Sequence, residues 1–197
     1  KEGEKVAILG VIGSGKSTVL KWLESKGIPC FESDRVGRVL LDQELKQAVI
    51  SRFGDTMYSK GTLDRGKLAS LVFNNPNALE DLNQIVHPAV QQAFEEFKQY
   101  NLTAPILVKE AAILFESGAY QNCDLVVLVC APKEDRIQRV MKRDGVRREE
   151  VLKRMALQWE DAKKKPLSDF ILNNADRATL EKQLEDLFVW LSQSKKD

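Results

Sequence analysis

Residues 10–17 read Gly10-Val11-Ile12-Gly13-Ser14-Gly15-Lys16-Ser17 and fit the phosphate-binding pattern G-x-x-x-x-G-K-[ST]. The apolar run at residues 5–9 predicts a buried strand before the pattern, and residues 17–25 predict a helix after it. The pattern therefore joins a strand to a helix, which is where a phosphate-binding loop has to lie. The alternative is an ordinary glycine-rich turn, but such a turn does not need Lys followed by Ser at this spacing.

Each residue type in this loop has a physical role in holding phosphate. Gly13 and Gly15 allow turns that a Cβ atom would obstruct, so that successive N–H groups can point toward an anion. The following helix adds the positive end of its dipole. Lys16 can place a charge on the β- and γ-phosphates, and Ser17 can bind the accompanying Mg²⁺. The expected nucleotide-binding residues here are Gly10, Val11, Ile12, Gly13, Ser14, Gly15, Lys16, Ser17 and Thr18.

Length and composition favour a single globular protein without a polyanionic partner. With 197 residues and a formal net charge of +1, the chain can bury one core and carries no overall field toward nucleic acid or anionic membranes. No apolar stretch is long enough to span a membrane, and no signal-peptide pattern precedes the first strand. The cysteines Cys30, Cys123 and Cys130 lack a C-x-x-C spacing, which favours reduced thiols. We therefore expect a cytoplasmic protein with no nucleic-acid or membrane partner.

An acidic cluster follows the second predicted strand. Residues 29–31 form that strand, and Glu32-Ser33-Asp34 come directly after it, where ligands gather in a parallel α/β sheet. Asp34 can accept the proton of an attacking hydroxyl, or hold a water on Mg²⁺ together with Ser17. As an alternative, Asp34 is the N-cap of the next helix, and the residues alone do not separate these interpretations. Asp34 to Gly37 also spell the D-x-x-G of GTPases, but no N-K-x-D follows.

Between residues 43 and 101 the strand signals disappear and helical periodicity takes over. The longest apolar stripe with helical spacing runs from Leu79 to Phe97. His87-Pro88 interrupts it, and we expect Pro88 either to start a new helical turn or to kink the helix. The sequence therefore predicts a helical insertion suited to receiving a substrate. A lone histidine beside proline is more often a packing or capping residue than a catalyst.

The sheet resumes after this insertion. Further strands are predicted over residues 105–108, 124–130 and 169–173. Glu110 and Glu116 follow the first of these strands and are expected near its carboxyl end. An amphipathic helix closes the chain.

Two basic helices follow the strand at residues 124–130. The first carries Arg139 and Arg143, which are four residues apart and share a helical face, and the second carries Arg154. A short glycine-containing turn joins them, which is the layout of a mobile lid that brings guanidinium groups onto a phosphoryl group. The alternative is an ordinary solvated basic face. The lysines at 163–165 are interpreted as a solvated helix end.

Taken in order, these landmarks resemble the dephospho-coenzyme A kinase family along nearly the whole chain. The matching segments are the Ile12 to Ser17 core of the loop, Asp34, Leu63-Asp64-Arg65, His87-Pro88, Leu114-Phe115-Glu116, Gln138-Arg139 with Arg143, Arg154 with Gln158, and Asp169-Phe170-Ile171 followed by Asn173. The chain departs from the family pattern at Val11, where the family usually has glycine, and at Ala112, where it has proline.

The resemblance implies a three-layer α/β P-loop kinase with a doubly wound parallel sheet, a helical substrate-binding insertion and a helical lid. By this likeness, residues 1–34, 105–138 and 166–197 form the nucleotide-binding core, 35–104 the substrate-binding region and 139–165 the lid. The implied activity is ATP-dependent phosphorylation of the ribose 3′-hydroxyl of dephospho-coenzyme A, the last step of coenzyme A synthesis. The implied oligomeric state is a monomer or weak oligomer.

The resemblance also implies roles for individual residues, with ATP and Mg²⁺ as cosubstrate and metal. Asp34 becomes the favoured base, and Lys16, Arg139 and Arg143 stabilise the transferring phosphoryl group. Asn173 becomes part of the adenine pocket. The residues implied on the substrate side are Asp34, Arg65, His87 and Glu116.

Two other functions remain open from the residues themselves. One is a different small-molecule P-loop kinase, acting on a nucleoside monophosphate or another metabolite alcohol. The other is a nucleotide-binding switch or scaffold whose helices serve a protein partner. The acid at Asp34 and the paired arginines on the basic helix argue against the switch.

Overall fold

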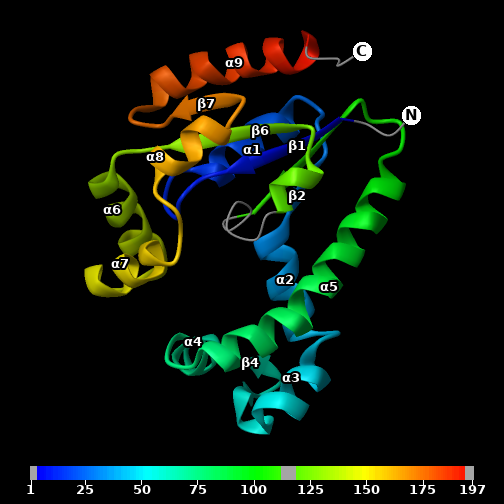
Figure 1. Cartoon of the computed structure of the whole chain (residues 1–197), viewed down its shortest axis with the longest axis vertical. Coiled ribbons are helices and arrows are strands. Elements are labelled where there is room, and N and C mark those ends of the chain that lie inside the picture. The colour runs from blue at the N-terminus through cyan, green and yellow to red at the C-terminus, as the bar shows by residue number, and fades with distance from the viewer. Residues whose placement is uncertain (1–3, 112–118, 194–197) are drawn as a thin grey trace. The chain divides into compact units, whose positions relative to one another are not determined.

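A computed structural model of the chain describes residues 4–111 and 119–193 (Figure 1). The chain divides into two compact units. The first combines Lys1–Phe31 with Asn101–Asp197 and contains the main sheet, whereas the second is the intervening Glu32–Tyr100 and is largely helical.

Five strands form the sheet of the first unit in the order β2-β5-β1-β6-β7. Their bounds are β1 (Glu4–Leu9), β2 (Cys30–Glu32), β5 (Ile106–Glu110), β6 (Leu125–Cys130) and β7 (Phe170–Asn173). β1 pairs in parallel with β5 on one side and β6 on the other, and β6 pairs in parallel with β7. Chain order thus reverses around the central β1, and in such sheets ligands bind at the carboxyl ends beside this reversal. The predicted doubly wound α/β sheet is confirmed.

The central strand is buried on both of its faces. Val6 and Ile8 belong to one hydrophobic cluster, whereas Ala7 and Leu9 belong to another on the opposite face. Each of these four side chains has at most 1% of its surface exposed. Continuous apolar sequence is what a parallel strand covered on both faces requires, which is why β1 and β6 were predictable.

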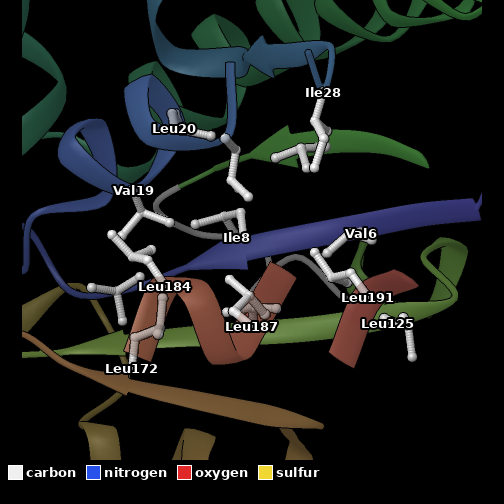
Figure 2. Close-up of a cluster of buried hydrophobic side chains, with 14 of the residues drawn as sticks. Val6, Ile8, Val19, Leu20, Ile28, Leu125, Leu172, Leu184, Leu187 and Leu191 are labelled. Atoms are coloured by element: carbon white, nitrogen blue, oxygen red, sulfur yellow. The ribbon is translucent and has the colours of Figure 1, made fainter. Parts of the chain in front are cut away.

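The helices of the first unit connect and cover the strands of the sheet. They are α1 (Lys16–Ser25), α6 (Lys133–Asp144), α7 (Arg148–Ala156), α8 (Asp161–Lys164) and α9 (Arg177–Gln193), with 3₁₀ turns η2 (Ala119–Asn122) and η3 (Lys165–Leu167). Leucines of α9 pack with Val19 and Leu20 of α1 against Ile8 (Figure 2). The rings of Trp22 and Phe188 also meet edge to face, 6.1 Å apart. This core holds α1 against the sheet and so positions the loop that precedes it.

The second unit is built on four helices. They are α2 (Ser33–Asp42), α3 (Lys46–Phe53), α4 (Arg65–Phe73) and α5 (Pro76–Tyr100), with a 3₁₀ turn η1 (Asp55–Met57). Its core consists of Val49, Met57, Leu63 and Leu68. Pro88 lies inside α5, which continues through it. Of the two alternatives, a new helical start at Pro88 is therefore wrong, and a kink of the existing helix at Pro88 stays a prediction.

A small hairpin interrupts the helices of the second unit. β3 (Tyr58–Ser59) and β4 (Thr62–Leu63) pair antiparallel. Lys60 and Gly61 form the turn with φ of 50° and 86°, as tight hairpin turns with two left-handed residues require. The prediction that residues 43–101 contain no strands is wrong here, because two-residue strands are too short to produce an alternating pattern.

The lysine run at the end of α8 differs from the sequence prediction. Lys163 and Lys165 are exposed, but Lys164 has only 1% of its surface exposed. Consecutive side chains on a helix point in different directions, so one lysine of three can face inward between two that face solvent. Residues 139–165 belong to the first unit, and their action as a lid stays a prediction.

Candidate active site

The phosphate loop, residues 10–17, connects the end of β1 to the start of α1. Gly13 and Gly15 have φ of 83° and 98°, a backbone region that L side chains rarely adopt. A Cβ atom on Gly13 would lie 2.5 Å from the carbonyl oxygen of Arg136, and one on Gly15 would overlap Nδ2 of Asn174. Both positions therefore require glycine, for the backbone angle and for space.

Carbonyl groups of the phosphate loop accept hydrogen bonds from the protein, among them the Gly15 carbonyl, which accepts from the N–H groups of Thr18 and Val19. Lys16 Nζ donates to Gly10 O (2.9 Å), Ser14 N to Val11 O (3.0 Å), Arg139 Nη1 to Gly13 O (3.3 Å) and Asn174 Nδ2 to Ser14 O (2.9 Å). In a planar trans peptide the next N–H points opposite to the carbonyl. Because Asn174 holds the Ser14 carbonyl, the Gly15 N–H points away from Asn174 and remains available to a ligand.

Like the Gly15 N–H, other N–H groups of the loop have no hydrogen-bond acceptor within the described part of the protein. Within residues 4–111 and 119–193, the N–H groups of Gly13, Gly15 and Ser17 donate to no acceptor of the protein. Unsatisfied N–H groups beside left-handed glycines favour an anion, and the N-terminus of α1 adds a partial positive charge. This arrangement suits a phosphate chain.

The Lys16 side chain is held between two strand ends. Its Nζ donates to the Gly10 carbonyl just after β1 and lies 3.9 Å from Oε1 of Glu110 at the end of β5. The two side chains are only 12% and 8% exposed. Such a low exposure strengthens the electrostatic action of the ammonium group compared with that of a surface lysine. Glu110, which the sequence placed only near the strand end, thus lies beside the loop lysine.

Arg139 joins three chain segments at the loop. Its guanidinium donates to Gly13 O and, over 3.0 Å, to Asn174 O. The Asn174 N–H in turn donates to Cys130 O at the end of β6 over 2.7 Å. The predicted phosphate-site arginine is therefore brought to the loop, and the connection between β7 and α9 is fixed there with it.

Asn174 was not predicted from the sequence, although its neighbour Asn173 was. The backbone N–H and carbonyl of Asn173 both bond the Gln183 side chain, over 2.7 and 3.0 Å. Asn173 is exposed, whereas Asn174 is buried with its amide on Ser14. The signal available in the sequence was the Asn173-Asn174 pair after a strand, where successive residues point in opposite directions. The role of Asn173 in adenine binding stays a prediction.

Arg143 does not join Arg139 at the phosphate loop in this structure. Its Nε and Nη2 donate to Asp144 over 2.7 and 3.1 Å, and Arg154 Nη1 donates to the same carboxylate over 2.8 Å. Hydrogen bonds from Arg143, and secondarily from Arg154, hold the pKa of Asp144 below its usual range. One carboxylate therefore holds two arginines of the basic helices in place.

Asp34 lies in the first turn of α2, directly after β2. The helix begins at Ser33 with Glu32 as its N-cap residue, so the alternative prediction that Asp34 is the N-cap is wrong. Its side chain is exposed, which leaves the carboxylate accessible to solvent and to a ligand.

The candidate substrate-side residues are described in part. Arg65 Nη2 donates to Asp42 over 2.6 Å and to Arg38 O over 3.2 Å within the second unit. His87 is exposed on α5. Glu116 lies outside the described residues.

Thiol chemistry is disfavoured at the end of β6. Burial, and secondarily the nearby Asp161 carboxylate, raises the pKa of Cys130 to about 11, so this residue stays a thiol at neutral pH. All three cysteines are free.

Within the described residues, no group of three or more His, Cys, Asp and Glu side chains is placed to hold a metal ion.

Comparison with known proteins shows which family the chain belongs to. The family model described as dephospho-CoA kinase matches residues 5–179. The dephospho-CoA kinase of Chlorobium luteolum is 40% identical over 178 residues, which is 86% of this chain and 81% of that protein. The dephospho-CoA kinase of Chlorobium chlorochromatii is 38% identical over 95% of this chain and 93% of its own length.

Solved structures agree with the sequence comparisons. The chain is similar to TT1252 from Thermus thermophilus, with a TM-score of 0.85 and 35% identity over the whole of both chains. It is also similar to dephospho-CoA kinase from Campylobacter jejuni, with a TM-score of 0.69 and 27% identity over 98% of both. Shikimate kinase from Acinetobacter baumannii, at 15% identity and a TM-score of 0.53, shares the fold alone. The chain belongs to the dephospho-CoA kinase family and is a phosphotransferase with an alcohol group as acceptor.

Proposed function

We propose that this chain transfers the γ-phosphoryl group of ATP to the ribose 3′-hydroxyl of dephospho-coenzyme A, with residues of the phosphate loop and Asp34 in the principal roles. The observation that carries the proposal is the loop itself. The carbonyls of Gly10, Gly13 and Ser14 are bonded to side chains of the protein. The N–H groups of Gly13, Gly15 and Ser17 are left for an anion. Family membership supplies the acceptor.

The phosphate loop and its Lys16 side chain are proposed to bind the phosphates of ATP. The N–H groups of the loop and the α1 N-terminus hold the β- and γ-phosphates, and the Lys16 ammonium neutralises charge that develops during transfer. Because Glu110 and the Gly10 carbonyl already position Lys16, little reorganisation is needed when ATP binds.

The residues present fit Mg²⁺ bound together with a nucleotide rather than alone. The described residues contain no cluster of three protein ligands, and Mg²⁺ is commonly held by one or two side chains plus substrate phosphates. Ser17, exposed in the first turn of α1, and Asp34 are the residues proposed to hold it. The ion would supply neutralisation of phosphate charge.

Asp34 is proposed as the general base. A carboxylate directly after a strand of an α/β sheet is suited to accepting the proton of the attacking 3′-hydroxyl. Its exposed position in the first turn of α2 supports this role, because the oxygens are accessible to the acceptor.

The arginines are proposed to act on the transferring group in two ways. Arg139, bonded to the Gly13 carbonyl, is held at the loop before the nucleotide arrives. Arg143 is held by Asp144 and would have to exchange this partner for phosphate oxygens when residues 139–165 close as a lid.

Asn173 is proposed to bind the adenine of ATP. Arg65, His87 and Glu116 are proposed to bind the acceptor.

We further propose that the enzyme works in the cytoplasm as a monomer or weak oligomer, without a nucleic-acid partner. Its balanced composition and net charge of +1 support the absence of a polyanionic partner. None of the helices in residues 4–111 and 119–193 is long and apolar enough to cross a membrane.

A substrate panel tests the proposed function. ADP formation from ATP and Mg²⁺ is measured with dephospho-coenzyme A, with AMP, with shikimate and without an acceptor. The proposal predicts that dephospho-coenzyme A stimulates ADP formation far more than the other acceptors. Stimulation by AMP or shikimate instead would assign the chain to a different small-molecule kinase activity, and tight ATP binding without any stimulation would support a switch.

A further inference from the structure

The segment after α7 contacts the phosphate loop through one side chain. Gln158 Oε1 accepts a hydrogen bond from the Ile12 N–H over 2.9 Å, and this contact is partly buried. Gln158 lies two residues beyond the end of α7 at Ala156, and its own N–H donates to Met155 O over 3.0 Å. The contact thus links the loop to the end of a helix.

The Ile12 side chain contacts the same helices. It packs against the buried cluster of Ile137 and Val140 from α6 and Val151 from α7. Both the peptide and the side chain of Ile12 are therefore held by the α6–α7 pair and the residues that follow it.

These bonds fix one peptide plane at the entry of the loop. The Val11 carbonyl and the Ile12 N–H belong to the same planar peptide and point in opposite directions. The carbonyl accepts the Ser14 N–H over 3.0 Å, and the N–H donates to Gln158. With both of its polar groups bonded, this peptide cannot rotate without breaking a hydrogen bond. It immediately precedes Gly13, whose N–H is available to a ligand.

We propose that Gln158 is a positioning residue for ATP: its side-chain carbonyl holds the Val11–Ile12 peptide in the orientation that presents the Gly13 N–H to the phosphates. The proposal rests on the proposed function insofar as the loop binds ATP. It assigns to the segment after α7 a task separate from charge neutralisation, because the contact acts through a neutral amide. A change in the position of α7 is transmitted directly to the loop.

The surroundings of Gln158 allow it to be replaced without disturbing the core. A cavity of about 540 Å³ lies beside the contact and is lined by Val11, Arg136, Gln158, Trp159 and Asp161, among others. A side chain of similar length can therefore be accommodated there. Variants at this position are expected to fold, which a thermal melt verifies.

The first test removes the acceptor atom. Gln158→Met keeps the length of the side chain but cannot accept from the Ile12 N–H, and Gln121→Met on η2 is the matched control at an exposed glutamine of the same unit. Affinities for ATP and for dephospho-coenzyme A are measured separately by calorimetry. We expect Gln158→Met to weaken ATP binding about tenfold, leave dephospho-coenzyme A binding unchanged and keep the wild-type melting temperature. Wild-type ATP affinity in a folded Gln158→Met protein would overturn the proposal, as would an equal loss in the control.

The second test keeps the oxygen and adds a charge. Gln158→Glu can still accept from the Ile12 N–H but brings a carboxylate to the phosphate loop, with Gln121→Glu as control. The expected loss of affinity increases from AMP to ADP to ATP and reaches about tenfold for ATP, because the carboxylate repels each added phosphate charge. A loss that is the same for all three nucleotides would contradict a position beside the phosphates.

These measurements are independent of the acceptor reaction. If the wild-type protein binds ATP but does not phosphorylate dephospho-coenzyme A, the proposed function fails while the role of Gln158 is still decided by the nucleotide affinities. If the reaction occurs and both Gln158 variants bind ATP as the wild type does, only the role of Gln158 fails.

Discussion

The Asn174 amide donates to the Ser14 carbonyl over 2.9 Å, and this bond is buried although the two residues are 160 positions apart. Asn174 also accepts the Arg139 guanidinium through its own carbonyl. The connection between β7 and α9 therefore holds the middle of the phosphate loop from the side opposite to the Gly15 N–H. Because both partners are desolvated, loss of either leaves a polar group unsatisfied.

Replacement of Asn174 by Ala should destabilise the protein and weaken ATP binding together. We expect the free energy of unfolding in urea to fall by about 1–3 kcal/mol, because the Ser14 carbonyl is left buried without a donor. Asn173→Ala is the matched comparison, since Asn173 is exposed, and its unfolding free energy should change by about 0.5 kcal/mol or less. A more destabilising effect at Asn173 than at Asn174 would contradict this assignment of the two asparagines.

Gly13→Ala tests the space around the phosphate loop. The added Cβ would meet the Arg136 carbonyl at 2.5 Å in addition to the strain of φ at 83°, whereas Gly145 has φ of 65° and no atom within 4 Å of its Cβ position. Gly145→Ala should therefore report the backbone strain alone, about 1–2 kcal/mol. We expect Gly13→Ala to lose more unfolding free energy than Gly145→Ala and also to lose ATP affinity. Equal losses in urea denaturation would show that the contact with Arg136 relaxes freely.

Asp144→Asn tests the carboxylate that holds Arg143 and Arg154. The pKa of Asp144 is lowered in the folded protein by these guanidinium groups, so its stabilising effect is present above the ordinary pKa and is lost as the pH falls through the lowered value. Because the ion pairs of Asp144 with the two arginines are in contact with solvent, we expect the unfolding free energies of Asp144→Asn and wild type to differ by about 1 kcal/mol or less at neutral pH. Thermal melts from pH 7 to acid should show this gap closing at low pH.

The control for that experiment is Asp186→Asn on the exposed side of α9, which should show no such gap. A gap between wild type and Asp144→Asn that widens toward acid pH would contradict the sign of the pKa shift.

Asp34→Asn tests the proposed base. A general base contributes about 10²- to 10⁴-fold to the rate, so kcat should fall by at least about 10²-fold. Asp55→Asn, at an exposed aspartate of the second unit, should retain wild-type kcat. Near-normal turnover of purified Asp34→Asn protein would remove Asp34 from this role.

Local patterns in the sequence predicted most of the fold. Gly13, Gly15 and Lys16 occur at fixed spacing because the loop needs them there, and the apolar runs of β1 and β6 reflect burial on both faces. The β3–β4 hairpin was missed because each strand has only two residues. Lys164 was misjudged because a short lysine run does not reveal which side chain faces inward.

The phosphate loop was predictable because its motif is continuous in the chain, and Arg139 followed from the family resemblance, but the contacts between distant segments were not predictable. Asn174 and Gln158 reach the loop through hydrogen bonds across 160 and 146 residues, and no local pattern encodes such partners. The same holds for Glu110, whose position at a strand end was predictable but whose approach to Lys16 depends on the pairing of β1 with β5. Tertiary pairing, rather than residue type, decides these contacts.

Phosphoryl transfer to the acceptor is measured most directly by the mass of the acceptor itself. The purified protein is incubated with ATP, Mg²⁺ and dephospho-coenzyme A, and the acceptor is followed by mass spectrometry while ADP is quantified. We predict a gain of one phosphoryl group on dephospho-coenzyme A, with one ADP formed for each acceptor converted. An acceptor of unchanged mass, from a protein that still binds ATP, would contradict the proposed reaction.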